Sequence, residues 1–372
     1  MTVYIVRNYP YSALSGVRRP LGVIERINKR LTAPLANRLK DKHYVTPNRI
    51  TWASFIVAGI LSPLMIVKGY FFISAILILI GAWLDSLDGD LARIRNQKSK
   101  EGAILDAVLD RYADLLVIAS IIMVVREFHD ALIVGLFAML GSFLVPFVRA
   151  ETESLGKSSV TTFGSRDIRN IMLVIGLGLG EPYALLWALA LTTNLSALHR
   201  LYHLVTKIEK ANIFKEILRS CFPIGIITPI MIIEKYFFVA AILILLAVML
   251  GGKAGSKEAE ALNSILWRFA DSLILISILI VLISDYSNSL LSLLIGLAAI
   301  IGLFLMSYVR VRVKAEKGIS VDFMPRIIFY LIIALGLILA QLNLTLLFIS
   351  ILLVSILTNL SASCEFYSAI RR

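Results

Sequence analysis

The stretch DSLDGDLAR at residues 85–93, followed by GAILDAVLD at residues 102–110, decides how the rest of the chain is interpreted. It lies where one apolar segment ends and the next begins. It places four carboxylates in or beside membrane-like sequence: Asp85, Asp88, Asp106 and Asp110. A charged side chain at the centre of a bilayer costs about 2.5–3.5 kcal/mol on insertion scales, so such residues are candidates for function by default. Four like charges close together also need a cation to neutralise them.

The composition is that of a membrane protein. The 372 residues are 58% hydrophobic and have a mean hydropathy of +0.84, which is too apolar for a soluble domain with a polar surface. Successive apolar runs of about twenty residues are typical of transmembrane helices. In the first half of the chain we expect six of them, at about residues 49–67, 70–92, 101–125, 130–152, 167–180 and 183–205.

Residues 1–48 form a basic arm. The first 49 residues carry ten Lys and Arg against Glu25 and Asp41, and basic residues then fall on alternate loops, as the positive-inside rule requires of an N-inside unit. Residues 21–39 alternate basic and apolar positions, which predicts an amphipathic helix on the membrane surface, with a solvated helix as the alternative. We therefore expect a multi-pass protein of the cell membrane, with both termini and the site cytoplasmic and with no nucleic-acid partner.

The chain repeats itself. Residues 60–80 match residues 226–246 at an offset of 166, and the sequence TNLSA at 193–197 recurs at 358–362. The Pro, Met and Tyr-Phe-Phe positions recur in the same order, which a shared apolar composition would not readily produce. The repeat predicts two six-span units in the same orientation, related by an axis along the membrane normal.

The predicted fold class is therefore an all-α integral membrane protein of two tandem six-helix units, with about twelve spans. The expected domains are the arm at 1–48, a first unit at 49–206 and a degenerate second unit at 207–372. The second unit has none of the four carboxylates, since the corresponding residues are Gly251, Ala254, Asn263 and Trp267. The first unit keeps a site, and the second keeps the scaffold.

The spacing of the aspartates places each pair on one face of a helix. Asp85 and Asp88 are three residues apart, and Asp106 and Asp110 are four apart. A short polar turn joins the two segments, so the facing ends of their helices can converge. Carboxylate oxygens without histidine or cysteine select magnesium, manganese or calcium rather than zinc.

Small residues accompany the aspartates. Gly89, Ala92 and Gly102 lie on the same helical ends, where they would let a ligand approach the backbone closely. Close helix packing is the alternative explanation for the glycines. Asp90, outside the regular spacing, is expected to be a solvated loop residue.

The same residues resemble the signature of the CDP-alcohol phosphotransferases. The pattern D-x-x-D-G-x-x-A-R at 85–93, eight residues, and then G-x-x-x-D-x-x-x-D at 102–110 matches the signature at every defined position. The resemblance covers about residues 20–206. It implies that a phosphoalcohol group is transferred from a CDP-alcohol to an acceptor hydroxyl with release of CMP, and that Mg²⁺ or Mn²⁺, as two ions, holds the diphosphate.

The resemblance also implies roles for individual residues. The metal ligands would be Asp85, Asp88, Asp106 and Asp110, with Asp110 also the candidate general base. The CDP-binding residues would be Asn48, Asp85, Gly89, Ala92, Arg93 and Gly102. The expected partners are a CDP-alcohol, lipid-linked by expectation, and membrane lipids. Because the resemblance implies homodimers, the second unit is expected to act as a built-in partner in an intramolecular pseudodimer, with a homodimer of the chain as the alternative.

Three arginines are candidates for binding a phosphorylated acceptor such as inositol phosphate: Arg149, Arg169 and Arg200. The guanidinium fork suits phosphate, and family members that take such acceptors resemble this chain at these places. Glycerol phosphate would fit equally well, and simple positive-inside flanking is the alternative. The second unit is expected to carry Arg310, Arg326 and Glu365 at the corresponding places.

Two other classes of protein remain open at this point. Twelve spans in two parallel halves are also a secondary-transporter plan, in which buried aspartates mark a cation pathway. The clustering of all carboxylates at one end of one half disfavours a transporter, whose site would be near the midplane. The third interpretation, a catalytically inactive scaffold, is disfavoured by the intact motif.

Overall fold

The computed structural model describes residues 32–160, 162, 164–206, 222–250, 256–285, 289–319 and 326–371, and every regular element in these ranges is a helix. Most of the predicted amphipathic arm lies outside the described residues. Its end is described, and residues 32–39 are helical. They pack through Leu35, Ala36 and Leu39 against Leu87 and Leu91 of the motif helix, so the end of the arm is part of the folded unit.

The helices predicted in the first half are confirmed, with bounds that differ by a few residues. The first predicted span is continuous from Pro47 to Val67 and consists of α2 (Pro47–Phe55), the π-helical η2 (Ile56–Leu61) and α3 (Ser62–Val67). The others are α4 (Phe71–Ile94), α5 (Lys100–Val125), α6 (Ala131–Ser154), α7 (Arg166–Gly178) and α8 (Pro182–Val205).

Local sequence explains where the helices of the motif begin and end. Thr46 caps α2, because its hydroxyl accepts from the Arg49 amide, and Pro47 occupies the first turn, where its missing N–H costs nothing. Ser99 caps α5 by accepting from the Gly102 amide at 3.0 Å. Between α4 and α5 the chain reverses at Asn96, whose φ of 51° is the left-handed conformation that asparagine tolerates. These signals bring Asn48, the end of α4 and the start of α5 together.

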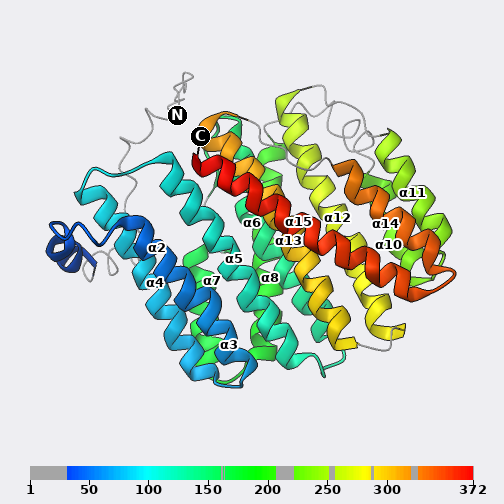
Figure 1. Ribbon diagram of the computed structural model, residues 1–372, viewed down its shortest axis with the longest axis horizontal. Helices are drawn as coiled ribbons and strands as arrows, with labels where there is room; N and C mark the ends of the chain where they lie inside the picture. Colours follow the sequence, from blue (N-terminus) through cyan, green and yellow to red (C-terminus); the bar gives the residue numbers. More distant parts are fainter. Residues whose placement is uncertain are drawn as a thin grey trace, which may run out of the picture.

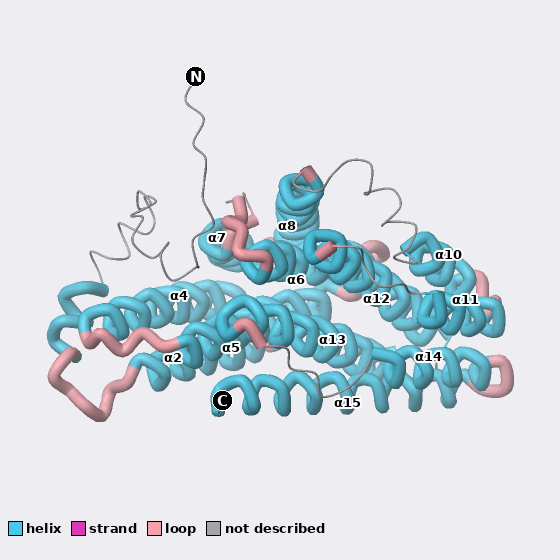
Figure 2. The backbone as a smooth tube through the Cα atoms, turned by 90° about the horizontal axis from the view of Figure 1, so that it is seen from above, coloured by secondary structure: helices cyan, strands magenta, loops and turns pink. Residues whose placement is uncertain are grey.

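The C-terminal half follows the same order of helices. It consists of α10 (Phe222–Ile233), α11 (Phe237–Leu250), α12 (Lys257–Asp285), α13 (Ser289–Lys317), α14 (Arg326–Ala340) and α15 (Leu344–Arg371). The helices pair as in the first half: α13 with α15 as α6 with α8, α11 with α14 as α4 with α7, and α12 with α13 as α5 with α6. In Figure 2, α7 and α8 lie on one side of the molecule and α14 and α15 on the opposite side.

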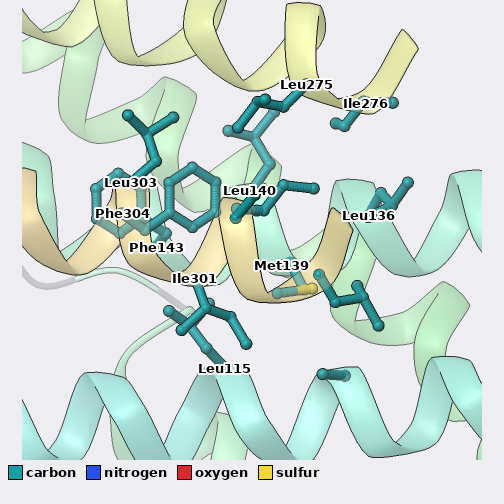
Figure 3. Close-up of a cluster of buried hydrophobic side chains, with 14 of the residues drawn as sticks. Leu115, Leu136, Met139, Leu140, Phe143, Leu275, Ile276, Ile301, Leu303 and Phe304 are labelled. Carbon is teal, nitrogen blue, oxygen red and sulfur yellow. The ribbon is translucent and has the colours of Figure 1, made fainter. Parts of the chain in front are cut away.

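The two halves meet through their central helices. α13 packs on α5 and α6, and α12 packs on α6 (Figure 1). At the centre of this contact Phe143 stacks on Phe304, with ring centroids 4.1 Å apart and planes 2° from parallel. Leucine, isoleucine and methionine side chains from both halves surround the stack (Figure 3). The stacked rings are 161 residues apart in the sequence.

Glycines at the same spacing of 161 have the same surroundings in the two halves. A Cβ added to Gly141 would lie 2.3 Å from the Thr193 hydroxyl, and one added to Gly302 would lie 2.3 Å from the Thr358 hydroxyl. The next residues match too, since the Asn194 amide donates to the Phe137 carbonyl and the Asn359 amide donates to the Ala298 carbonyl. The close crossing of α6 with α8 is thus built from the same side chains as that of α13 with α15.

Two ion pairs join the halves reciprocally. Lys157, which follows α6, pairs with Glu258 in the first turn of α12 at 2.8 Å, and Lys317 at the end of α13 pairs with Glu101 in the first turn of α5 at 2.6 Å. Each pair joins the C-terminal side of one helix to the first turn of a helix in the other half. Such an exchange is what a two-fold axis between like surfaces produces.

Six of the described helical segments are long and apolar enough to cross a membrane. They are Pro47–Val67, Phe71–Ile94, Ala131–Ser154, Lys257–Asp285, Ser289–Lys317 and Leu344–Arg371. The prediction of a membrane protein is thereby supported. The count of twelve spans and the cytoplasmic placement of the ends stay predictions.

Candidate metal and nucleotide site

Three of the four predicted carboxylates converge. One oxygen from each of Asp85, Asp88 and Asp106 lies within 4.8 Å of the others. The Oδ1 atoms of Asp85 and Asp106 are buried and have no hydrogen-bond partner among the residues that the structure describes. Buried, unpartnered carboxylate oxygens are costly unless a cation takes them. An all-oxygen donor set of this kind fits Mg²⁺ or Mn²⁺.

Asp110 lies beside this group, where Arg166 joins it to Asp85. The guanidinium of Arg166 donates through Nη1 to Asp85 Oδ2 and through Nη2 to Asp110 Oδ1, both at 2.6 Å. Arg166 is the first residue of α7, so the start of this helix delivers a positive charge to the carboxylates. The Arg166 side chain thus supplies part of the positive charge that the acidic cluster requires.

Residues of α2 and the arm hold the other face of α4. The Thr51 hydroxyl donates to Asp88 Oδ2, which fixes the orientation of that carboxylate. Asp90, expected to be solvated, is instead buried and accepts hydrogen bonds from Thr32 and Arg93. That expectation was wrong because α4 continues as a helix through residue 94, which turns Asp90 towards the arm.

Arg95 fastens the segment that precedes α2. Its guanidinium donates to four main-chain carbonyls, those of Leu39, Lys40, Lys42 and Val45, at 2.6 to 3.0 Å. These carbonyls belong to the turn between the arm helix and Thr46. One side chain at the end of α4 therefore sets where α2 begins, and with it the position of Asn48.

A cavity of about 250 Å³ opens beside the carboxylates. Its wall includes two of them and five of the residues expected to bind CDP: Asp88, Asp106, Asn48, Gly89, Ala92, Arg93 and Gly102. Thr51, Gln97, Lys98 and Ser99 also line it, while Asp85 does not.

The two glycines of this cavity differ in their surroundings. Among the described residues, a Cβ on Gly89 would meet only the flexible end of Arg93, at 3.6 Å, whereas a Cβ on Gly102 would come within 3.2 Å of Ser99 Oγ and 3.5 Å of Asn48 Oδ1. Helix packing therefore does not require glycine at position 89. A side chain at position 89 would instead occupy part of the cavity.

The three candidate acceptor-binding arginines lie close to one another, and each has a local partner. Arg149 Nε donates to Glu153 at 2.7 Å. Arg200 is buried and donates to the Thr162 hydroxyl and the Val145 carbonyl, and the positive charges of Arg149 and Arg169 act on it. Arg169 is 2% exposed and donates to Asp114 and to the Gly164 carbonyl. Of the three, Arg149 is the most accessible, with 57% of its side chain exposed.

The sequence profile of the CDP-alcohol phosphatidyltransferases matches residues 44–204, which contain this site. A phosphatidylinositol phosphate synthase of Corynebacterium glutamicum is 32% identical over 181 residues, which are 46% of this chain and 82% of that protein. The chain belongs to the CDP-alcohol phosphatidyltransferase family.

Relatives in the CDP-alcohol phosphatidyltransferase family include longer proteins. A bifunctional IPC transferase and DIPP synthase of Rubrobacter xylanophilus is 35% identical over 161 residues, which are 42% of this chain and 36% of that protein. This chain therefore matches about a third of that relative's length. A crystal structure of the Mycobacterium tuberculosis phosphatidylinositol phosphate synthase with CDP-DAG bound superposes with a TM-score of 0.43 at 24% identity, covering 46% of this chain and 92% of that one.

Some residues of the site in this family member were not predicted from the sequence. Arg166 was assigned only to a basic loop, although it precedes Arg169 by one helical turn and so shares its face. Thr51 and Arg95 had no signal, because their partners are distant in sequence. Glu153, which bonds to Arg149, was also missed.

The C-terminal half lacks the acidic motif but keeps part of the charged framework. Arg111 pairs with Asp114 in α5, and Arg268 pairs with Asp271 in α12, each at 2.8 Å. Arg310 is held by Glu365 through both Nε and Nη2. Arg326 is the first described residue of α14, and its correspondence to Arg169 stays a prediction.

Proposed function

We propose that this protein transfers a phosphoalcohol group from a CDP-alcohol to a hydroxyl of a phosphorylated acceptor, releasing CMP. The observation that carries the proposal is the convergence of Asp85, Asp88 and Asp106 beside a cavity lined by the rest of the signature. Membership of the family supports the reaction class. The names of two relatives, a phosphatidylinositol phosphate synthase and a bifunctional IPC transferase, favour inositol phosphate as the acceptor.

The residues of the cavity would hold the nucleotide end of the donor. Gly89, Ala92 and Gly102 leave room at the backbone, while Asn48 and Arg93 provide polar groups. Asp85, Asp88 and Asp106, with Asp110 beside them, would hold one or two Mg²⁺ or Mn²⁺ ions. A bound divalent ion would neutralise the diphosphate and stabilise the leaving CMP.

Asp110 is proposed to act on the acceptor. The acceptor oxygen forms a bond to the phosphorus on the alcohol side, the bond from that phosphorus to the CMP oxygen breaks, and Asp110 takes the hydroxyl proton. The guanidinium of Arg166, which donates to Asp110 Oδ1 at 2.6 Å, fixes the orientation of this carboxylate. Arg149, with Arg200 and Arg169 behind it, would attract the acceptor phosphate. Glycerol phosphate is the alternative acceptor, since the same arginines would suit it.

We further infer that residues 207–372 are a second six-helix unit, which packs on the first as one subunit of a two-fold dimer packs on its partner. The Phe143–Phe304 stack and the reciprocal pairs Lys157–Glu258 and Lys317–Glu101 support this inference. The chain would then be a pseudodimer with one catalytic centre and about twelve spans. Its ends and the site would be cytoplasmic, by the placement of the basic loops.

The test is CMP release by the purified full-length protein with Mg²⁺ or Mn²⁺. CDP-diacylglycerol is offered with inositol phosphate, glycerol phosphate, free inositol or serine, and Asp110→Asn is the control. Release that needs metal, Asp110 and inositol phosphate is expected. Release only with unphosphorylated acceptors would refute the role of the arginines. Absence of release with every pair, from folded metal-binding protein, would refute the transferase and restore the transporter interpretation.

A further inference from the structure

The C-terminal half places a charged side chain against the acceptor side of the site. Arg312, on α13, donates through Nη1 to Glu153 Oε2 at 3.0 Å, and the other oxygen of Glu153 accepts from Arg149 Nε at 2.7 Å. Arg312 is held in turn by Glu316 of its own helix at 2.7 Å. A chain of ion pairs therefore runs from the half without the acidic motif to the arginine proposed to meet the acceptor.

We propose that Arg312 is a positioning residue for acceptor binding, acting through Glu153 on Arg149. The inference rests on the proposed function, in which Arg149 binds the acceptor phosphate. It assigns the C-terminal half a part in the reaction that its missing carboxylates would not suggest.

The geometry gives the physical reason. Glu153 is 8% exposed, so its carboxylate must be satisfied by neighbouring charges. With Oε2 taken by Arg312, Glu153 offers only Oε1 to Arg149 and engages it at Nε. The Nη groups of Arg149, whose side chain is 57% exposed, are then available for a phosphate. Without Arg312, both carboxylate oxygens could close on the Arg149 guanidinium.

The C-terminal half shows that closed arrangement. Arg310, 161 residues after Arg149, is gripped by Glu365 through Nε and Nη2 at 2.6 to 3.0 Å. An arginine bound in this bidentate way has fewer donors left for a ligand. Arg310 is therefore bound by a carboxylate through two nitrogens, whereas Arg149 is bound through Nε alone.

The Arg312–Glu153 pair has no counterpart with the same charges on the other side of the contact between the halves. At the same spacing of 161, Lys314 stands where Glu153 does, and Glu151 stands where Arg312 does. The signs are reversed, whereas the pairs Lys157–Glu258 and Lys317–Glu101 keep theirs. The position four residues after the arginine is therefore acidic beside Arg149 and basic beside Arg310.

The experiment compares Arg312→Gln with Lys157→Gln, which removes a different ion pair between the halves. The rate of CMP release is measured while the inositol phosphate concentration is varied at saturating CDP-diacylglycerol. It is then measured while the CDP-diacylglycerol concentration is varied at saturating inositol phosphate. We expect Arg312→Gln to raise the KM for inositol phosphate about tenfold, with kcat and the KM for CDP-diacylglycerol within twofold. Lys157→Gln should leave all three within twofold. Arg312→Lys, which keeps the charge, should recover part of the affinity.

A double variant separates positioning from general loosening of the interface. If Arg312 acts through Glu153, adding Arg312→Gln to Glu153→Gln should change the KM for inositol phosphate by less than twofold. A further tenfold rise in that background would overturn the proposal, as would equal effects of Arg312→Gln and Lys157→Gln. Should wild-type protein release no CMP with any acceptor, the proposed function fails, which is a different outcome from an active enzyme that does not respond to Arg312→Gln.

Discussion

The two halves of this chain share their helix packing and differ in their charges. Gly141 meets Thr193 and Gly302 meets the corresponding Thr358, and Phe143 and Phe304 stack on each other. These positions touch other helices, so a change at any of them disturbs the packing. The carboxylates of the first half contact neighbouring helices through polar groups instead, Asp88 through Thr51 of α2 and Asp85 and Asp110 through Arg166 of α7. Their convergence suits the proposed metal site and is not explained by apolar packing.

The comparison also shows which charged side chains the two halves share and which they do not. An ionised carboxylate buried without a cation costs several kcal/mol. The C-terminal half carries Asn263 and Trp267 at the positions that correspond to Asp106 and Asp110, so it has no carboxylate to neutralise there. Its Arg310 is neutralised by Glu365. Its Arg268 and Asp271 pair with each other.

The largest expected effect separates the halves by activity. Asp110→Asn should lower kcat for CMP release about 10²- to 10⁴-fold, the usual range for the loss of a general base. Trp267→Phe, at the corresponding place in the C-terminal half, should leave kcat within about twofold. The measurement is steady-state CMP release at saturating substrates. Comparable losses in the two variants would mean that both halves take part in the chemistry.

The next effect concerns the cation beside the carboxylates. Arg166→Gln leaves Asp85 and Asp110 without their partner and should destabilise the metal-free protein by about 3–5 kcal/mol, as for other broken buried ion pairs. Divalent metal should restore much of this, because it neutralises the same carboxylates. A ligand at 100 times its Kd adds about 2.7 kcal/mol. Thermal unfolding in detergent, with and without Mn²⁺, measures both the stability lost in the variant and the stability that the metal restores.

Arg169→Gln is the matched control for that experiment. Its partner Asp114 lies outside the proposed metal-binding group, so this variant keeps the acidic cluster, and Mn²⁺ should add only the stability that it adds to the wild-type protein. If Mn²⁺ stabilised neither the wild-type protein nor either variant, the acidic cluster would not be a metal site.

The sequence predicted the helices of the first half because apolar length, loop charge and the Thr-Pro start are local signals. It also predicted the three converging aspartates, since residues three or four apart share a helix face. It missed the roles of Arg95 and Arg166. Arg95 bonds to the Leu39 carbonyl, 56 residues away, and Arg166 bonds to Asp85, 81 residues away. It also misplaced Asp90, because nothing in its neighbourhood indicates that the arm covers that side of α4. Contacts between distant segments require the fold.

A smaller effect tests whether the halves share their packing. Gly141→Ala and Gly302→Ala should each destabilise the protein by about 1–3 kcal/mol, the usual cost of overpacking, because each new Cβ would lie 2.3 Å from a threonine hydroxyl. The two losses should agree within about 0.5 kcal/mol if the helix crossings are equivalent. Thermal unfolding of the two variants under identical conditions measures this. A loss in only one of them would contradict the shared packing.

The smallest expected effect distinguishes a glycine that leaves room for a ligand from a glycine that allows close helix packing. Gly89→Ala places a methyl group in the cavity, where it meets only the end of Arg93 at 3.6 Å. The KM for the CDP-alcohol should therefore rise about tenfold, equivalent to about 1.4 kcal/mol. Thermal stability should hold or increase, since alanine is the better helix former by about 1 kcal/mol. A lowered melting temperature with an unchanged KM would mean that Gly89 serves helix packing, as Gly141 does. It would contradict the proposal that the nucleotide binds in this cavity.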